Sequence, residues 1–185
     1  TDCGDSPAAG WRAFYRNSVA ELRSGSSPFA PVHQRARSLL RGDSVLEVGC
    51  CFGLFALQCA QDGRSVSALD LCVGALELLE AASADFDVPV HTRLGDARAL
   101  PYDDDAVDSV TLIHLLEHLD EDDVAQTLAE AVRVARLRVI VAVPFEEVPS
   151  PHFGHLQQLT VADLQRWSHP WRELAPQIST HHGGW

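Results

Sequence analysis

The alternation of short apolar runs with amphipathic segments constrains the fold of this chain more than any other feature of its sequence. The runs SVLEVG, SVSALD, VPVHTRLG, AVDSVTLI and RVIVAVPF have the length and composition of strands. Between them, apolar residues recur at helical spacing in GLFALQCAQ, GALELLEAASADF and EDDVAQTLAEAVRVAR. Strands that are apolar almost throughout are typical of a sheet covered by helices on both faces. The alternation therefore predicts an α/β fold with a doubly wound, mostly parallel sheet.

The N-terminal part of the chain carries two helical patterns, around residues 9–22 and 29–41. We expect residues 1–42 to form a helical lid and residues 43–185 to form the α/β domain, the two making one folding unit. Trp11, Tyr15 and Phe29 are candidates for covering a ligand or stacking on a sugar. Core packing is the alternative for at least two of these three side chains.

The C-terminal part reads as a loop, a helix and a final strand. Thr160, with an acidic residue three positions on, predicts a helix start before VADLQRW. The tail APQIST predicts a short strand, and the Gly-Gly pair after it predicts a turn. We therefore expect the last strand to be incomplete and the natural chain to continue past Trp185.

Composition excludes several classes of partner. The formal charge is −12, with 26 acidic residues against 14 basic ones, all arginine. An acidic surface repels phosphate backbones, so we expect no nucleic acid partner. No apolar run reaches the roughly 18 residues that a membrane helix needs. We expect a cytoplasmic protein with a small-molecule substrate, and leave a homodimer open.

Cysteine usage fits a reduced protein rather than a disulfide framework or a zinc knuckle. The number is odd and no C-x-x-C occurs. Two adjacent cysteines, Cys50 and Cys51, lie between Gly49 and Gly53. They could form a redox or metal site, or they could belong to a cofactor-binding loop. We interpret both cysteines as small residues in a cofactor loop.

The loop after the first strand indicates the kind of cofactor. Asp70 ends the second strand 21 residues after Gly49, a spacing that suits a carboxylate accepting from ribose hydroxyls. An acidic residue that only starts a turn is the alternative. The sequence G-C-C-F-G lacks the third glycine of a dinucleotide site, and Glu47 would repel a pyrophosphate. A cofactor with a positive centre and no phosphate, such as S-adenosylmethionine, fits better than NAD.

Four blocks of the chain resemble the motifs of class I S-adenosylmethionine-dependent methyltransferases, in order and spacing, from about Asp43 to Leu164. They are VLEVGCCFG, SALDL and the two halves of LGDARALPYDDDAVDSVTLIHLLEHL. The resemblance implies a Rossmann-like methyltransferase fold with a seven-stranded type of sheet and S-adenosylmethionine as cofactor. It places Asp96 against the adenine amino group and Ala97 against its ring, and Cys51 where the family usually has glycine. The cofactor-binding residues expected on these grounds are Glu47, Gly49, Cys51, Gly53, Asp70, Leu71, Asp96, Ala97 and His114.

Histidines gather in the loops that follow the later strands, which should open on the same face as the cofactor. An alcohol acceptor has to lose a proton, and histidine, with a free pKa of about 6.5, is a suitable base. This favours O-methylation, and the alternative for each histidine is loop capping or solvent exposure. The candidate bases, in order, are His118 and His155, then His152 and His182.

The sequence assigns no residue as a metal ligand. HLLEH matches the inverted zinc-peptidase signature, but the residues before it form a strand rather than the helix that signature needs. A divalent metal held by some of the histidines with Asp103, Asp104 or Glu146 is an alternative that stays open.

The acceptor is the least determined part of the prediction. The segments HLLEHL, AVPFEEVPSPHFGHLQQLT and HHGGW are similar to the mycofactocin oligosaccharide methyltransferases, which implies a glucose hydroxyl on a glycosylated, peptide-derived cofactor. The rival functions are methylation of a phenol, quinone or carboxylate, a non-catalytic cofactor-binding module, and a nucleotide-dependent oxidoreductase.

Overall fold

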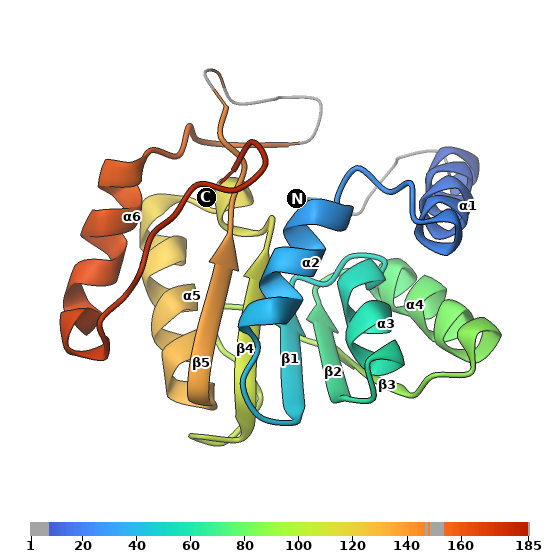
Figure 1. Cartoon of the computed structure of the whole chain (residues 1–185), viewed down its shortest axis with the longest axis horizontal. Coiled ribbons are helices and arrows are strands. Elements are labelled where there is room, and N and C mark those ends of the chain that lie inside the picture. The colour runs from blue at the N-terminus through green and yellow to red at the C-terminus, as the bar shows by residue number, and fades with distance from the viewer. Residues whose placement is uncertain (1–7, 147, 149–153, 185) are drawn as a thin grey trace.

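A computed structural model of the chain shows one parallel sheet between two layers of helices (Figure 1). The structure describes residues 8–146, 148 and 154–184, with side chains from residue 15 onward. Five parallel strands lie in the order β3-β2-β1-β4-β5. Their bounds are β1 (Ser44–Val48), β2 (Ser65–Asp70), β3 (Val90–Leu94), β4 (Val107–Ile113) and β5 (Ala135–Ala142). The predicted α/β, doubly wound fold is confirmed.

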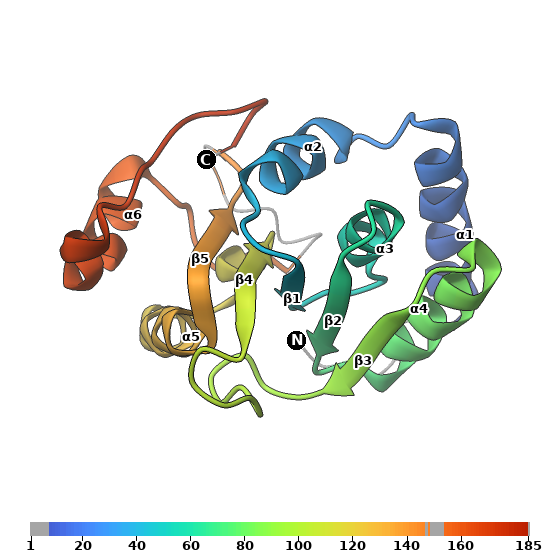
Figure 2. The same cartoon turned by 60° about the horizontal axis from the view of Figure 1, so that its bottom comes forward.

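The helices cover both faces of the sheet (Figure 2). On one face, side chains of α2 (Ala30–Leu39), α3 (Leu54–Gln61) and α4 (Val73–Phe86) share one apolar core with the strands. On the other face, α5 (Glu121–Val134) and α6 (Val161–Ser168) pack in a second core. Every residue of β4 is buried. Strands that are apolar almost throughout are the usual sequence signal of such double coverage, although β4 also buries Asp108, Ser109 and Thr111.

The first helix, α1 (Ala8–Ser24), packs on the outside of the α3 and α4 layer. The Tyr15 hydroxyl donates to the carbonyl of Leu78 at 2.9 Å, and its ring lies 5.7 Å from the ring of Phe52. Tyr15 therefore packs against the core. Phe29, by contrast, is 38% exposed. The side chain of Trp11 lies outside the described residues.

Helix ends follow the sequence signals closely. Thr160 and Asp163 form the predicted capping box, in which each side chain accepts from the backbone N–H of the other residue. The Asp120 side chain caps α5 by accepting from the backbone N–H of Asp123. Two short 3-10 helices complete the described elements, η1 (Leu116–His118) and η3 (His169–Leu174).

The tail differs from the sequence prediction. The segment APQIST forms no strand, and nearly all of residues 171–180 are exposed. Pro176 has no N–H to donate to a neighbouring strand. Among the described residues, the β-bridges of the tail are limited to those of Gly184 with Pro144 and His181. Among the described residues, the sheet thus has five strands rather than the expected seven-stranded type. No helix in the described part of the chain is long and apolar enough to cross a membrane.

Candidate functional site

The loop between β1 and α3 lies where the strand order reverses, with β2 on one side of β1 and β4 on the other. Three residues of the loop have left-handed backbone: Gly49 at φ +70°, Cys51 at +48° and Gly53 at +65°. A Cβ on Gly49 would come within 2.7 Å of Leu115 Cδ1, so the loop also needs glycine there for space. Cys51 adopts left-handed backbone although it carries a side chain, at a cost of about 1 kcal/mol.

Asp70 connects this loop to the end of β2. Its Oδ2 accepts from the backbone N–H of Cys51 at 2.7 Å, and its Oδ1 accepts from that of Cys72 at 2.8 Å. The carboxylate is thereby fixed at the carboxyl edge of the sheet, as predicted. Each oxygen keeps a second lone pair, which can accept from a ribose hydroxyl. Leu71, the next residue, is 65% exposed beside it.

Glu47 points from β1 into the protein rather than into solvent. It is 4% exposed, and its Oε2 accepts from the backbone N–H of Ala56 at 2.9 Å. Burial raises the pKa of Glu47 to about 8, and the charge of Asp70 adds to the effect. A cation bound nearby would favour the carboxylate form, whereas a pyrophosphate would oppose it. The residue therefore fits a sulfonium or ammonium group better than a phosphate.

Asp96 and Ala97 follow β3, and here the structure adds a partner that the sequence did not reveal. Arg98 donates to both oxygens of Asp96, with a closest approach of 2.6 Å, and also pairs with Asp123. The hydrogen bonds from Arg98 lower the pKa of Asp96. Ala97 is 9% exposed. Their contacts with adenine stay a prediction.

Neither thiol of the cysteine pair is poised as a thiolate: burial and the charge of Asp70 raise the pKa of Cys51 to about 12. Cys50 is 4% exposed, and burial raises the pKa of its thiol far above the ordinary value, so it stays protonated. Its weak Sγ hydrogen bond goes to the backbone oxygen of Cys51 at 3.7 Å. The four described cysteines are free: Cys50, Cys51, Cys59 and Cys72.

His114 ends β4 with a positive φ of +54°, and the residues after it enter the short helix η1. Its Nδ1 lies 3.2 Å from Oε1 of Glu117, and its ring meets the Phe29 ring edge to face at 5.7 Å. The two histidines of HLLEH thus do not share a helix, which is what excluded the peptidase signature. His114 lies beside the cofactor loop, because Leu115, its neighbour, packs on Gly49.

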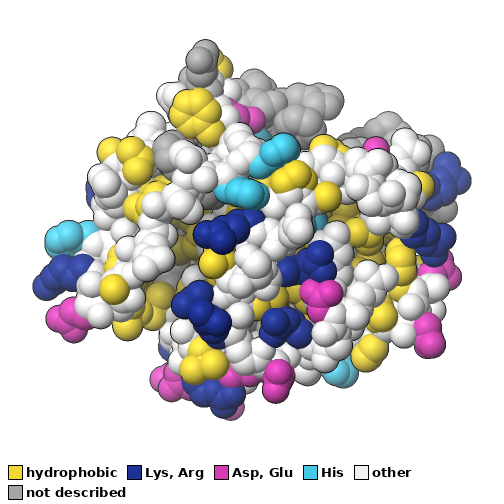
Figure 3. All heavy atoms as spheres, in the orientation of Figure 1, with side chains coloured by type: hydrophobic (Ala, Val, Ile, Leu, Met, Phe, Trp, Pro, Cys, Tyr) yellow, Lys and Arg dark blue, Asp and Glu magenta, His cyan; other side chains and the backbone are white. Residues whose placement is uncertain are grey.

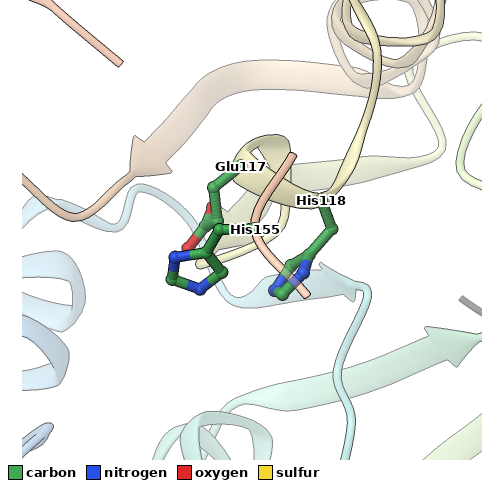
Figure 4. A group of neighbouring side chains, drawn as sticks. All are labelled: Glu117, His118 and His155. Carbon is green, nitrogen blue, oxygen red and sulfur yellow. The ribbon is translucent and has the colours of Figure 1, made fainter. Parts of the chain in front are cut away.

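Glu117, His118 and His155 converge at the carboxyl edge of the sheet (Figure 4). One ligand atom from each of the three lies within 4.8 Å of the others; we call this group the Glu-His-His cluster. The rings of His118 and His155 lie 4.9 Å apart, and Nδ1 of His155 lies 2.6 Å from Oε2 of Glu146. Sequence reasoning selected the two histidines but missed Glu117. The available signal was an acidic residue within the otherwise apolar HLLEHL.

The two remaining candidate bases are His152 and His182. His152 lies outside the described residues. His182 is exposed at φ +47°, next to His181, whose Nε2 lies 3.2 Å from the Pro31 carbonyl oxygen. Figure 3 shows histidine side chains at the surface near the N-terminal end of α2, above a group of arginines. The structure therefore brings together two of the three candidate histidines that it describes.

A doubly wound sheet, a glycine-bearing loop at its switch point and an acid at the end of β2 are the features of an α/β domain that binds an adenosine-containing cofactor. The sequence model of the family described as "Methyltransferase domain" matches residues 46–143, just over half of the chain. The chain belongs to this family. The predicted class and cofactor are confirmed.

Similar curated proteins carry related names. A demethylmenaquinone methyltransferase of Renibacterium salmoninarum is 32% identical over 127 residues, which cover 68% of this chain and 49% of that protein. A ubiquinone biosynthesis O-methyltransferase of Cupriavidus pinatubonensis is 32% identical over 96 residues, covering 51% and 39%. The chain thus spans about half or less of the length of these relatives.

Solved structures show the same fold. A S-adenosylmethionine-dependent methyltransferase from Methanosarcina mazei has a TM-score of 0.64 at 17% identity, over 77% of this chain and 84% of its own. One from Aquifex aeolicus has a TM-score of 0.64 at 16% identity, over 82% and 86%. The [4+2]-cyclase SpnF also matches with a TM-score of 0.64, at 20% identity over 75% and 56%. At these identities the likeness concerns the fold alone.

Proposed function

We propose that this chain is an S-adenosylmethionine-dependent O-methyltransferase that acts on a hydroxyl group of a small molecule. The observation that carries the proposal is the position of His118 and His155. Both lie at the sheet edge that also holds the cofactor loop. Leu115, which directly precedes η1, packs on Gly49 of that loop. The names of the relatives support methyl transfer, and those of the ubiquinone group support an oxygen acceptor.

For the acceptor we propose a sugar hydroxyl of a glycosylated, peptide-derived cofactor, the mycofactocin oligosaccharide. The similarity of HLLEHL, AVPFEEVPSPHFGHLQQLT and HHGGW to enzymes of that kind supports it. The second candidate is a quinol or phenol, and the names of the curated relatives favour it. A non-catalytic cofactor-binding role is the third, since Cys51 occupies a left-handed position of the loop and the segment APQIST forms no strand.

The side chains proposed for methyl transfer form two groups at the carboxyl edge of the sheet, one for the cofactor and one for the acceptor. The cofactor supplies an electrophilic methyl group on a sulfonium. Asp70 would hold the ribose hydroxyls, and Glu47 would favour the positive centre. The acceptor oxygen bonds to the methyl carbon, and sulfur keeps the electron pair of the broken sulfur–carbon bond. The acceptor hydroxyl has to lose its proton in this step. His118 or His155 would take that proton in a metal-free site.

Two measurements test the proposal. Calorimetry with S-adenosylhomocysteine and, separately, with NAD should show binding of the first only; binding of NAD alone would refute the assignment. A mass gain of one methyl group on a glycoside, but not on a quinol or phenol of similar size, would support the sugar acceptor. Methylation of the quinol alone would move the function to the second candidate. Tight cofactor binding without turnover on any acceptor would favour the non-catalytic role.

The variants His118→Ala and His155→Ala should lower turnover while S-adenosylhomocysteine affinity is retained. His169→Ala, an exposed histidine on η3, is the matched control and should change neither. His152 and His182 are the next candidates if both variants keep full turnover. A lid function for residues 1–42, a homodimer and a cytoplasmic location stay predictions.

A further inference from the structure

Glu117 is the residue from which this inference starts. Its side chain is 1% exposed, and its Oε1 lies 3.2 Å from Nδ1 of His114. Its Oε2 is buried and has no hydrogen-bond partner among the described residues. A buried carboxylate oxygen without a partner is costly, by several kcal/mol for a charged group in the idealised case. Such an atom calls for a donor or a cation that the described residues do not supply.

The hydrogen bonds of the two histidines fix which ring nitrogen holds a lone pair. Nδ1 of His118 lies 3.2 Å from the carbonyl oxygen of Gly154, and Nδ1 of His155 lies 2.6 Å from Oε2 of Glu146. Both partners are acceptors, so in each neutral imidazole the proton is on Nδ1 and the lone pair is on Nε2. A ring held by a carbonyl or a carboxylate through its other nitrogen is the usual arrangement of a metal-ligating histidine.

The Glu-His-His cluster therefore brings together a carboxylate oxygen and two imidazole lone pairs. We propose that Glu117, His118 and His155 bind one divalent transition-metal cation, and that zinc is the ion this ligand set suits best. Two histidines and a carboxylate form a ligand set of catalytic zinc sites, in which a fourth position stays open to water or substrate.

The ligand types also argue against magnesium and calcium, which prefer oxygen ligands, whereas imidazole suits zinc and its neighbours in the first transition series. The ligand atoms lie up to 4.8 Å apart, compared with about 3.3 Å around a tetrahedral zinc ion with ligand distances near 2.05 Å. The cluster would have to contract on binding. Because hydrogen bonds hold the backbone around the cluster, the contraction would come from side-chain rotation.

That backbone is fixed by contacts between η1 and the segment that carries His155. The N–H of Leu156 donates to the carbonyl of Glu117 at 2.8 Å. The side-chain amide of Gln157 donates to the carbonyls of Leu116 and Leu119, at 3.3 and 2.7 Å. Two segments far apart in the sequence thus present their ligands to one point (Figure 4).

The role of the cation, unlike its binding, rests on the proposed function. A hydroxyl acceptor in the open position would be oriented toward the cofactor edge, and the cation would lower the pKa of the hydroxyl. The hydroxyl proton would pass to water as the acceptor oxygen bonds to the methyl carbon. In this arrangement His118 and His155 are ligands rather than bases.

The experiment measures the metal directly. The full chain is treated with a chelator, dialysed and titrated with Zn²⁺ by calorimetry, and in parallel with Co²⁺ by visible absorption, which reports tetrahedral coordination by nitrogen and oxygen. We expect one equivalent of metal in the wild-type chain. Glu117→Gln, His118→Ala and His155→Ala should each weaken affinity by about 100-fold or more, since loss of a group that only orients a ligand already costs 10–100-fold.

Matched controls separate a lost ligand from a lost fold. Glu121→Gln and His169→Ala change exposed residues of the same types and should leave metal affinity unchanged. Binding of S-adenosylhomocysteine by each variant shows that the domain is folded. If Glu117→Gln fails to fold, the two histidine variants decide. The proposal is overturned if the wild-type chain binds no stoichiometric metal, or if the folded histidine variants bind it as tightly as wild type.

The two proposals fail separately. Metal bound by the three residues without methylation of any acceptor would refute the proposed function and leave the metal site standing. Methylation by a chain that binds no metal would refute the metal site and leave the function standing. Methylation that is lost with the metal and returns with Zn²⁺ would support both.

Discussion

Replacing His33 should make the folded domain less sensitive to mild acid. His33 lies on α2 and is 6% exposed, with its Nδ1 3.1 Å from Oε1 of Gln58 and its ring near those of Phe29 and Phe55. The pKa of His33 is lowered from 6.5 to about 4, mainly by burial and to a smaller extent by the nearby His114 and Arg37, against the Gln58 hydrogen bond. The folded state therefore holds this imidazole neutral in a range where the unfolded chain protonates it.

The sign and size follow from proton linkage. Between pH 6.5 and pH 4 the unfolded chain binds the extra proton, so the free energy of unfolding falls as pH falls through that window. Above pH 6.5 both states are neutral and the contribution is complete. With these two pKa values the loss is about 2 kcal/mol at pH 5 and approaches about 3 kcal/mol below pH 4. Either value is a large fraction of an ordinary domain stability of about 5–15 kcal/mol.

The assay is urea unfolding at pH 7.5, 6 and 5 for the wild type, His33→Gln and His169→Gln. Glutamine can still hydrogen-bond Gln58 but has no proton to bind, so His33→Gln should lose about 2 kcal/mol less than wild type between pH 7.5 and pH 5. The exposed His169→Gln controls for loss of a histidine and should keep the wild-type slope. Equal slopes in wild type and His33→Gln would refute the reasoning, as would a His33 pKa near 6.5 measured by NMR.

Three further predictions concern the cofactor loop. A methyl group on Gly53 would lie 2.3 Å from Leu79 Cδ1, so Gly53→Ala should lower the free energy of unfolding in urea by about 2–4 kcal/mol. The control is Gly25→Ala, where φ is positive but the surrounding space is open, and it should cost about 1 kcal/mol. Because burial raises the pKa of Glu47 to about 8, binding of S-adenosylmethionine should release about 0.9 proton at pH 7, seen by calorimetry in buffers of different ionisation enthalpy and absent in Glu47→Gln. Cys51→Gly should change stability by no more than about 1 kcal/mol and keep cofactor affinity and turnover, whereas loss of turnover would assign chemistry to the thiol.

Most of the fold could be predicted from the sequence because each element carries its own local signal. The period of apolar residues distinguishes strands from helices, and the capping residues Thr160 and Asp163 mark the start of α6. The predicted strand at APQIST fails for a different reason. A short segment forms a strand only when a neighbouring strand can hydrogen-bond with it. In the described part of the tail, β-bridges occur only at Gly184 and its partners.

The site could be predicted as far as it depends on one loop and one strand end. Gly49, Gly53 and Asp70 are set by chain geometry at the switch point, so their spacing in the sequence is informative. The ion pair between Asp96 and Arg98 and the meeting of Glu117 with His155 depend on side-chain directions and on the path of a long loop. Neither leaves a periodic signal in the sequence.

The two uses proposed for His118 and His155 draw on the same lone pairs, and this decides the order of experiments. A nitrogen that binds zinc cannot accept the acceptor's proton, so alanine variants of either histidine lower turnover under both hypotheses. Glu117 separates them when bound metal is measured together with turnover. Its buried Oε2 would be a ligand to a cation under one hypothesis, whereas beside a histidine base the carboxylate would only stabilise the protonated imidazole. Loss of turnover in Glu117→Gln together with loss of bound metal would therefore assign the histidines as ligands. Turnover that persists in Glu117→Gln with no metal present would return one of them to the role of base.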